Sequence, residues 1–188
     1  MVLKMSNMVD GVHYKFLNYP KLPDELEQLC LDQLNKPEFF IFDLSKNEII
    51  TRKVIIDGEV VVKKQCTFEV FSAPTEVIDW LLSNKIIDSI DTEVVVQRSY
   101  NGTALFPHTD NPENYNNNLT NLHKRTTALN YLLSESGPTT CFYNTNNLND
   151  ILESVLIPKS VWHTLNVNHL HGVENIEFDR ISLSITLN

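Results

Sequence analysis

The second half of the chain is a series of short strand signals separated by turn residues, and this pattern limits the fold more than any other feature. Apolar and β-branched runs follow one another from Glu93, with Gly, Pro and Asn between them. Many short strands at such spacing are typical of a barrel or jelly roll made of two sheets. We expect strands at Val94–Arg98, Leu105–Thr109, Thr126–Leu133, Thr140–Tyr143, Ser154–Ile157, Ser160–Leu165, His169–Val173 and Arg180–Leu187.

The first half of the chain predicts helices and a hairpin around this core. Apolar spacing indicates helices over Lys21–Asn35 and Pro74–Asn84, while residues 1–21 have no clear period and should form an extended arm. Strand signals at Ile49–Ile56 and Glu59–Lys64 flank an Asp-Gly pair, which is a strong hairpin signal.

The length of 188 residues allows one domain with a substantial core. We expect a single domain that is mainly β with flanking helices, in which residues 1–92 form an α/β support and residues 93–188 form a jelly-roll, cupin-like core.

Net charge, cysteine content and hydrophobicity limit which partners and which cellular location we expect for this protein. A net charge of −9 disfavours nucleic acid as a partner, because the field of the protein repels phosphates. Three cysteines without close pairing indicate reduced thiols and a cytoplasmic location. We find no signal peptide and no apolar run long enough for a membrane span. The abundance of asparagine favours an AT-rich genome, such as that of a phage or virus. The oligomeric state is left open.

The last predicted strand separates apolar from polar residues by strict alternation. Its apolar face carries Ile181, Leu183, Ile185 and Leu187. Its polar face carries Arg180, Ser182, Ser184 and Thr186. Because strand residues two apart point the same way, Arg180 and Ser182 should share one direction, which in a barrel can be the ligand cavity.

His108 and Asp110 form the first candidate metal-binding pair. Residues two apart on a strand project to one side, about 6–7 Å apart at Cα, so both can reach one ion. A third ligand must come from elsewhere in the chain. The candidates are His13, His123, His163, His169 and His171.

The position of Arg180 favours His171 among these histidines. Nine residues separate the two, which allows neighbouring strands joined by the polar loop Glu174–Asp179. An imidazole and a guanidinium could then lie at opposite ends of one small ligand. His169 would face the same way as His171 and is the leading alternative. Otherwise we expect His169 and His163 to be structural or supporting residues.

Two histidines and one carboxylate are the ligand pattern of non-haem Fe(II) oxygenases. Three coordination positions stay free for a bidentate cosubstrate and O₂. The guanidinium of Arg180 suits the far carboxylate of such a cosubstrate through a two-pronged, charge-assisted bond. Ser182 and Tyr131 could add neutral hydrogen bonds to the same carboxylate.

The segment from Glu93 to Leu187 resembles the Fe(II)/2-oxoglutarate-dependent oxygenases, and within them the prolyl-hydroxylase-like branch. That family has an HxD pair, a distal histidine and a following basic residue, which here match His108-Thr-Asp110, His171 and Arg180. Three further segments are similar to strands or turns of the family: Arg98–Gly102, Arg125–Leu133 and Gly137–Phe142.

The resemblance implies a double-stranded β-helix with Fe(II) on His108, Asp110 and His171. It also implies that 2-oxoglutarate chelates the iron and that Arg180 binds the 5-carboxylate. Tyr131 and the Arg-x-Ser residue Ser182 match family residues that bind 2-oxoglutarate, and Tyr100 is a further candidate.

The implied reaction consumes O₂, with ascorbate as a supporting reductant, and hydroxylates a peptidyl (prolyl-like) or small-molecule substrate with release of succinate and CO₂. The Asn-rich segment from Asn111 to Arg125 is the candidate substrate lid. The alternatives are a nucleobase or nucleic-acid oxygenase and a cupin-like metal-binding module without turnover.

Overall fold

Two β-sheets and two α-helices make up the described part of the chain. The structure is a computed structural model, and it describes residues 10–43, 51–56, 59–65, 68–110, 126–135 and 139–187. The helices are α1 (Asp24–Gln33), α2 (Thr75–Ser83) and a short 3-10 helix, η2 (Pro37–Phe39). The strands are β1 (Tyr14–Phe16), β2 (Phe40–Asp43), β3 (Thr51–Ile56), β4 (Glu59–Gln65), β5 (Phe68–Ser72), β6 (Val94–Ser99), β7 (Thr103–His108), β8 (Thr127–Leu132), β9 (Thr140–Asn144), β10 (Asn147–Val155), β11 (Trp162–Asn166), β12 (His171–Ile176) and β13 (Arg180–Thr186).

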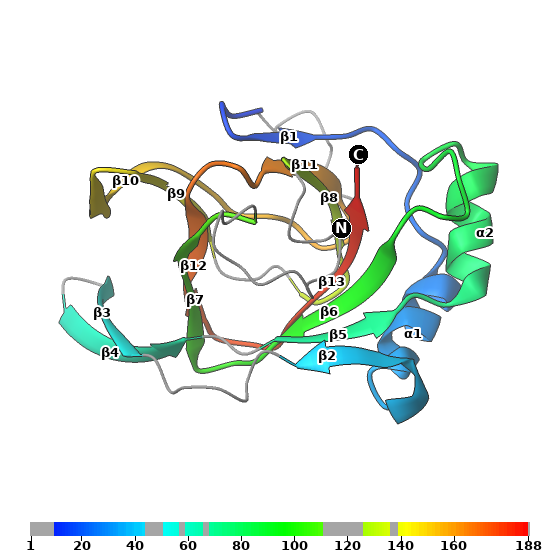
Figure 1. The fold of residues 1–188 in the computed structure, drawn as a ribbon, viewed down its shortest axis with the longest axis horizontal. Helices are drawn as coiled ribbons and strands as arrows, with labels where there is room; N and C mark the ends of the chain where they lie inside the picture. The colour runs from blue at the N-terminus through cyan, green and yellow to red at the C-terminus, as the bar shows by residue number, and fades with distance from the viewer. Residues whose placement is uncertain are drawn as a thin grey trace.

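The C-terminal half winds back and forth between the two sheets. One sheet has the order β1-β11-β8-β13-β6-β5-β2, and the other has the order β10-β9-β12-β7-β4-β3. From β6 to β13 successive strands alternate between the sheets, apart from the β9–β10 hairpin, and the sheets enclose a common interior (Figure 1). This arrangement confirms the predicted jelly roll and its mainly β class.

The N-terminal half extends both sheets. Strands β3 and β4 form the predicted hairpin, with Val54 opposite Val61, while its Asp-Gly turn lies outside the described residues. Strand β5 pairs with β6, and β4 pairs with β7 in parallel. The arm over residues 1–21 contains a strand that its sequence did not indicate. This strand, β1, adds an edge to the seven-stranded sheet by pairing with β11.

The helices cover one face of the seven-stranded sheet (Figure 1). Helix α1 begins after Pro23, three residues later than the start predicted at Lys21. The helices bury Cys30, Val77 and Leu81 against sheet residues that include Leu129 and Leu183, and Leu22, just before α1, joins the same cluster. Fully burying each large apolar side chain contributes about 1.5–3 kcal/mol, so this layer holds the helices in place. Both α-helices are far too short to cross a membrane.

Strand β13 presents the predicted two faces. Leu183 and Ile185 are fully buried in the cluster under the helices. Ser182 pairs with Leu132 of β8, which packs with Ala128 and Phe142 in a second cluster between the sheets. The polar face of β13 therefore looks into the interior, as the alternation predicts.

Candidate metal centre

Strand pairing places His108 and His171 side by side. His108 ends β7, His171 begins β12, and the two residues are directly opposite each other in the antiparallel register. Their ring centroids are 4.4 Å apart. Gly172 permits this approach of the two strands, because a Cβ at this position would lie 2.4 Å from the carbonyl oxygen of Leu105.

Asp110 completes the group just beyond the end of β7. Its backbone N–H donates to the carbonyl oxygen of Val167 at 2.9 Å, which fixes the position of the residue. Its Oδ1 lies 3.4 Å from His108 Nε2 and 3.6 Å from His171 Nε2. The side chains of Asp110 and His171 are 12% and 7% exposed, and that of His108 is 36% exposed. The group is therefore enclosed on two sides and more open at His108.

Both imidazoles present Nε2 to the carboxylate. The Nδ1–H of His108 donates to the carbonyl oxygen of Phe106 at 2.8 Å, and that of His171 donates to the carbonyl oxygen of His169 at 3.0 Å. These bonds place the proton on Nδ1 and leave the lone pair on Nε2, which is the form that binds a metal.

The donor set and its spacing fit a divalent transition metal. The three ligand atoms of His108, Asp110 and His171 all lie within 4.8 Å of one another. Atoms at right angles around one ion, each about 2.1 Å from it, would be about 3 Å apart. A small closure of the observed distances would therefore complete the coordination by two nitrogens and one oxygen.

His169, the leading alternative ligand, lies outside this group. Its Nε2–H donates to the carbonyl oxygen of Tyr143 at 3.1 Å, and its ring stacks on His13 with centroids 4.1 Å apart. The same residue holds His171 through its own carbonyl oxygen. The structure thus gives His169 the supporting position that was its other predicted role.

Arg180 begins β13 and projects into the interior with Ser182. Both side chains are half-buried. The Nη2 of Arg180 lies 3.5 Å from Oγ1 of Thr140, which is 1% exposed on β9 in the opposite sheet. Thr140 was not among the predicted site residues, although it belongs to the Gly137–Phe142 segment that resembles the oxygenases. A guanidinium beside the Thr140 hydroxyl, with Ser182 on the same strand face, can bind a carboxylate.

The comparisons with solved structures agree with the observed fold. No family model and no curated protein matches the sequence. Among solved structures, OsALKBH1 superposes with a TM-score of 0.57 at 9% identity, over 96% of this chain and 100% of its own. A prolyl-4-hydroxylase from Pseudomonas putida gives 0.52 at 12% identity, over 94% of each chain. An oxidoreductase of the 2OG-Fe(II) oxygenase family from Burkholderia pseudomallei gives 0.51 at 14% identity, over 93% of this chain and 84% of its own.

The chain has the double-stranded β-helix fold. In this double-stranded β-helix, the candidate metal ligands lie on β7 and β12 of the six-stranded sheet and Arg180 lies on β13 of the seven-stranded sheet. The predicted fold class is therefore confirmed. The identities to the solved structures are low, so the evidence for the site comes from the geometry of its own residues.

Tyr131 lies on the wrong face of the double-stranded β-helix to bind a cosubstrate. It is fully buried under the helices, and its hydroxyl donates to Oε1 of Glu27 on α1. Ser160 Oγ donates to the same oxygen at 2.8 Å. Burial first, and then the bond to the Glu27 carboxylate, raise the pKa of the Tyr131 hydroxyl. The prediction of Tyr131 as a cosubstrate ligand is wrong, because period-2 alternation turns its neighbour Asn130 inward instead.

Replacing Tyr131 with phenylalanine is expected to reduce stability and leave cosubstrate binding unchanged. The variant removes one donor from the buried Glu27 carboxylate, a loss of about 1–3 kcal/mol in the free energy of unfolding. Urea denaturation measures this loss, and titration with 2-oxoglutarate measures the Kd. Tyr19→Phe, at a 38% exposed residue, is the matched control. A weakened Kd with unchanged stability would restore the predicted role of Tyr131.

Tyr100 also lies away from the Arg180 side of the site. Its hydroxyl accepts a hydrogen bond from Nη2 of Arg98 at 3.0 Å, and Arg98 forms an ion pair with Glu69. Arg98 pairs with Ile181 of β13, so it is on the face opposite that of Arg180. The structure therefore gives Tyr100 a partner other than the predicted cosubstrate.

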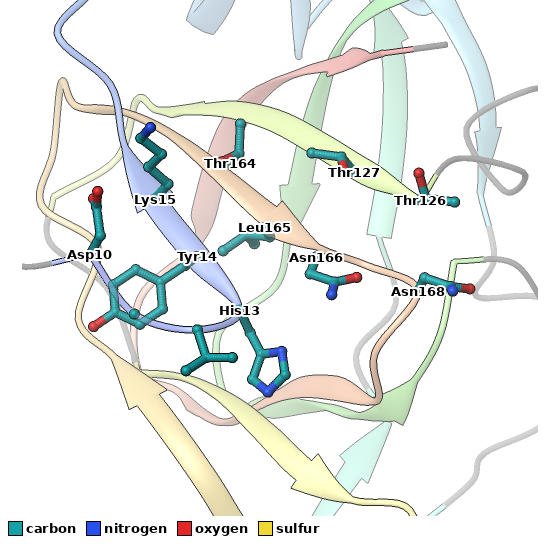
Figure 2. Close-up of a pocket in the computed structure, with 12 residues that line it drawn as sticks. Asp10, His13, Tyr14, Lys15, Thr126, Thr127, Thr164, Leu165, Asn166 and Asn168 are labelled. Carbon is teal, nitrogen blue, oxygen red and sulfur yellow. The ribbon is translucent and has the colours of Figure 1, made fainter.

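An open pocket of 530 Å³ lies at the edge formed by β1, β11 and β8 (Figure 2). Lys15, Thr164 and Thr127 rise on one side of these strands. Lys15 pairs with Thr164, whose neighbour His163 faces the interior, so these side chains lie on the outer face. Leu165 also lines the pocket and packs in the cluster between the sheets, whereas neither Arg180 nor the candidate metal ligands are among the lining residues. The candidate lid from Asn111 to Arg125 lies outside the described residues.

Proposed function

We propose that this protein is an Fe(II)- and 2-oxoglutarate-dependent dioxygenase that hydroxylates a peptidyl or small-molecule substrate and releases succinate and CO₂. The convergence of His108, Asp110 and His171 carries the proposal. The inward-facing Arg180 on the facing sheet supports it, because a dicarboxylate cosubstrate needs a cation at its far end.

His108, Asp110 and His171 would bind Fe(II) and leave coordination positions open for the cosubstrate and O₂. Iron with bound 2-oxoglutarate supplies the activation of O₂ and the oxidising power for hydroxylation, and ascorbate serves as a supporting reductant. The hydrogen bonds from Nδ1 of His108 and His171 to backbone carbonyls keep both rings in the binding orientation and increase their basicity. These residues thus set the position at which oxidation occurs.

Arg180 would bind the 5-carboxylate of 2-oxoglutarate by a two-pronged ion pair. Its half-buried position strengthens this charge-assisted bond, because the field of a charge is less screened away from water. Thr140 and Ser182 add neutral hydroxyl donors beside it. Together they would orient the cosubstrate with its keto acid end toward the metal ligands.

The substrate class is proposed from two observations. The Pseudomonas putida prolyl-4-hydroxylase shares this fold over 94% of each chain, which supports a prolyl-like peptide substrate. OsALKBH1 shares the fold as well, and a nucleobase substrate is the alternative, but the net charge of −9 works against binding to nucleic acid. A screen of succinate release over peptides, free amino acids and nucleotides tests these classes directly.

Addition of 2-oxoglutarate to the Fe(II)-loaded protein without air is expected to produce a charge-transfer absorption band at the violet end of the visible spectrum. The band reports chelation by the keto acid, so it requires the metal ligands and the open positions together. Absorption spectroscopy measures it, and the sample without 2-oxoglutarate is the control. If metal is bound and no band appears, the cupin-like module without turnover becomes the better assignment.

A further inference from the structure

His163 is a fully buried histidine with one unused nitrogen. It lies on β11 and is 0% exposed. Its Nδ1–H donates to the carbonyl oxygen of Val161 at 3.1 Å, so Nε2 carries the lone pair. Nε2 has no hydrogen-bond partner among the described residues. Buried polar atoms are almost always paired, so an unpaired nitrogen in the interior calls for an explanation, and a bound ligand is one.

The strand register turns His163 toward the same interior as Arg180. His163 pairs with Asn130 of β8, and Asn130 pairs with Ser184 of β13. Ser184 Oγ donates to Asn130 Oδ1 at 2.7 Å, so these side chains meet between the strands. Ser184, Ser182 and Arg180 alternate along the inward face of β13. His163 therefore belongs to the face that would receive the far end of the cosubstrate.

The surroundings keep His163 neutral in the absence of a ligand. The pKa of His163 is lowered to about 4, mainly because the ring is buried. The hydrogen bond to the Val161 carbonyl raises the pKa, whereas the positive charge of Arg180 lowers it further. The residues opposite His163 on β8 and β1, Asn130 and Phe16, carry no charge. Among the residues that the structure describes, Arg180 on β13 is the charged group found to shift the pKa of this imidazole.

We propose that His163 takes up a proton from solvent when the dicarboxylate binds, and that its Nε2–H then donates a hydrogen bond to the carboxylate held by Arg180. This inference rests on the proposed function. It makes His163 a second cation for the cosubstrate and makes cosubstrate affinity depend on pH.

The hydrogen bonds available to the His163 ring favour its protonated form when the carboxylate is bound. A neutral ring with its proton on Nδ1 would set the Nε2 lone pair against the carboxylate. A proton on Nε2 alone would set the Nδ1 lone pair against the carbonyl oxygen of Val161. The imidazolium satisfies both acceptors, and the bound carboxylate offsets the Arg180 charge that otherwise disfavours it.

Calorimetry of 2-oxoglutarate binding to the Mn(II)-loaded protein tests the proposal. In buffers of different ionisation enthalpy at pH 6.5, binding should take up about one proton. Above the pKa of the free pocket, the Kd should rise with pH, by up to about tenfold per pH unit. 2-Oxobutyrate is the same keto acid without the distal carboxylate, and its binding should take up no proton at this site.

His163→Gln keeps a neutral hydrogen-bond donor and removes the titration. This variant should bind 2-oxoglutarate with a Kd that does not change over pH 6–8 and without the extra proton. Nitrogen NMR of the wild-type protein gives a test that does not depend on the variant folding. With diamagnetic Zn(II) in place of Mn(II), a protonated Nε2 should appear for His163 on adding 2-oxoglutarate and should not appear with 2-oxobutyrate.

Two results would overturn the inference. The first is binding of 2-oxoglutarate to the wild-type protein with the same proton balance as 2-oxobutyrate. The second is an unchanged neutral His163 in the NMR spectrum of the complex. In both cases 2-oxoglutarate still binds, so the proposed function stands. If the Mn(II)-loaded wild-type protein binds no 2-oxoglutarate, the proposed function itself fails.

Discussion

Asp110→Ala is expected to reduce iron affinity and succinate formation by at least about 100-fold. The carboxylate is the anionic ligand of the group, and its Oδ1 lies within 3.6 Å of both imidazole Nε2 atoms. Loss of a residue that only supports a ligand typically costs about 10- to 100-fold in metal affinity or activity, so loss of the ligand itself should cost more. Equilibrium dialysis with Fe(II) and assay of succinate formed without added substrate measure the two effects.

Asp79→Ala is the matched control for this variant. Asp79 is an exposed residue of α2, away from the metal ligands, and its loss should leave both measurements unchanged. Circular dichroism establishes that both variants fold. Full iron binding and succinate formation in a folded Asp110→Ala protein would remove the metal assignment and the proposed function with it.

Arg180→Met is expected to weaken 2-oxoglutarate binding by about 100-fold or more while leaving metal binding intact. Methionine keeps much of the length of the side chain and removes its charge and donors. Truncating one partner of a buried, hydrogen-bonded charge pair costs about 2–5 kcal/mol. Each 1.4 kcal/mol corresponds to about a tenfold change in Kd. Titration of the Mn(II)-loaded protein with 2-oxoglutarate measures the change.

The specificity of this effect is tested with a second ligand and a second variant. 2-Oxobutyrate has no distal carboxylate, so it should bind equally to the wild-type protein and to Arg180→Met. Lys159→Met removes an exposed cation whose ion pair with Glu135 contributes about 0–1 kcal/mol, and it should bind 2-oxoglutarate normally. Equal losses for both ligands in Arg180→Met would show that Arg180 stabilises the site and does not bind the carboxylate.

The fold was predictable wherever the alternation of side chains extends over several residues. Strand β13 shows this best, because its apolar and polar faces were both located correctly. Strand β1 could not be predicted, since three residues are too few to show a period. The predicted strand Ser154–Ile157 overlaps β10 only at Ser154 and Val155. Strand β10 begins at Asn147, and its earlier part was missed because register irregularities near Ile151 disrupt the alternation.

The convergence of the candidate metal ligands was predictable because their spacing in the sequence is local or depends on one hairpin-like connection. His108 and Asp110 need only a strand end, and His171 follows from its distance to Arg180. Tyr131 was misplaced, because a likeness in the Tyr-Leu pair outweighed the alternation that turns Asn130 inward. The positions of Thr140 and His163 near Arg180 depend on contacts between strands far apart in the sequence, so nothing local indicated them.

Gly172 on β12 lies directly against main-chain atoms of β7. The distance between His108 and His171 is therefore determined by contact between the main chains of these two strands. The carbonyl oxygen of Leu105 lies where a side chain at position 172 would begin. This spacing therefore depends less on the side chains elsewhere in the interior than on the close approach of the two main chains. We expect that evolution or protein engineering could replace other interior residues and retain the candidate metal ligands in their present arrangement, provided that position 172 stays a glycine.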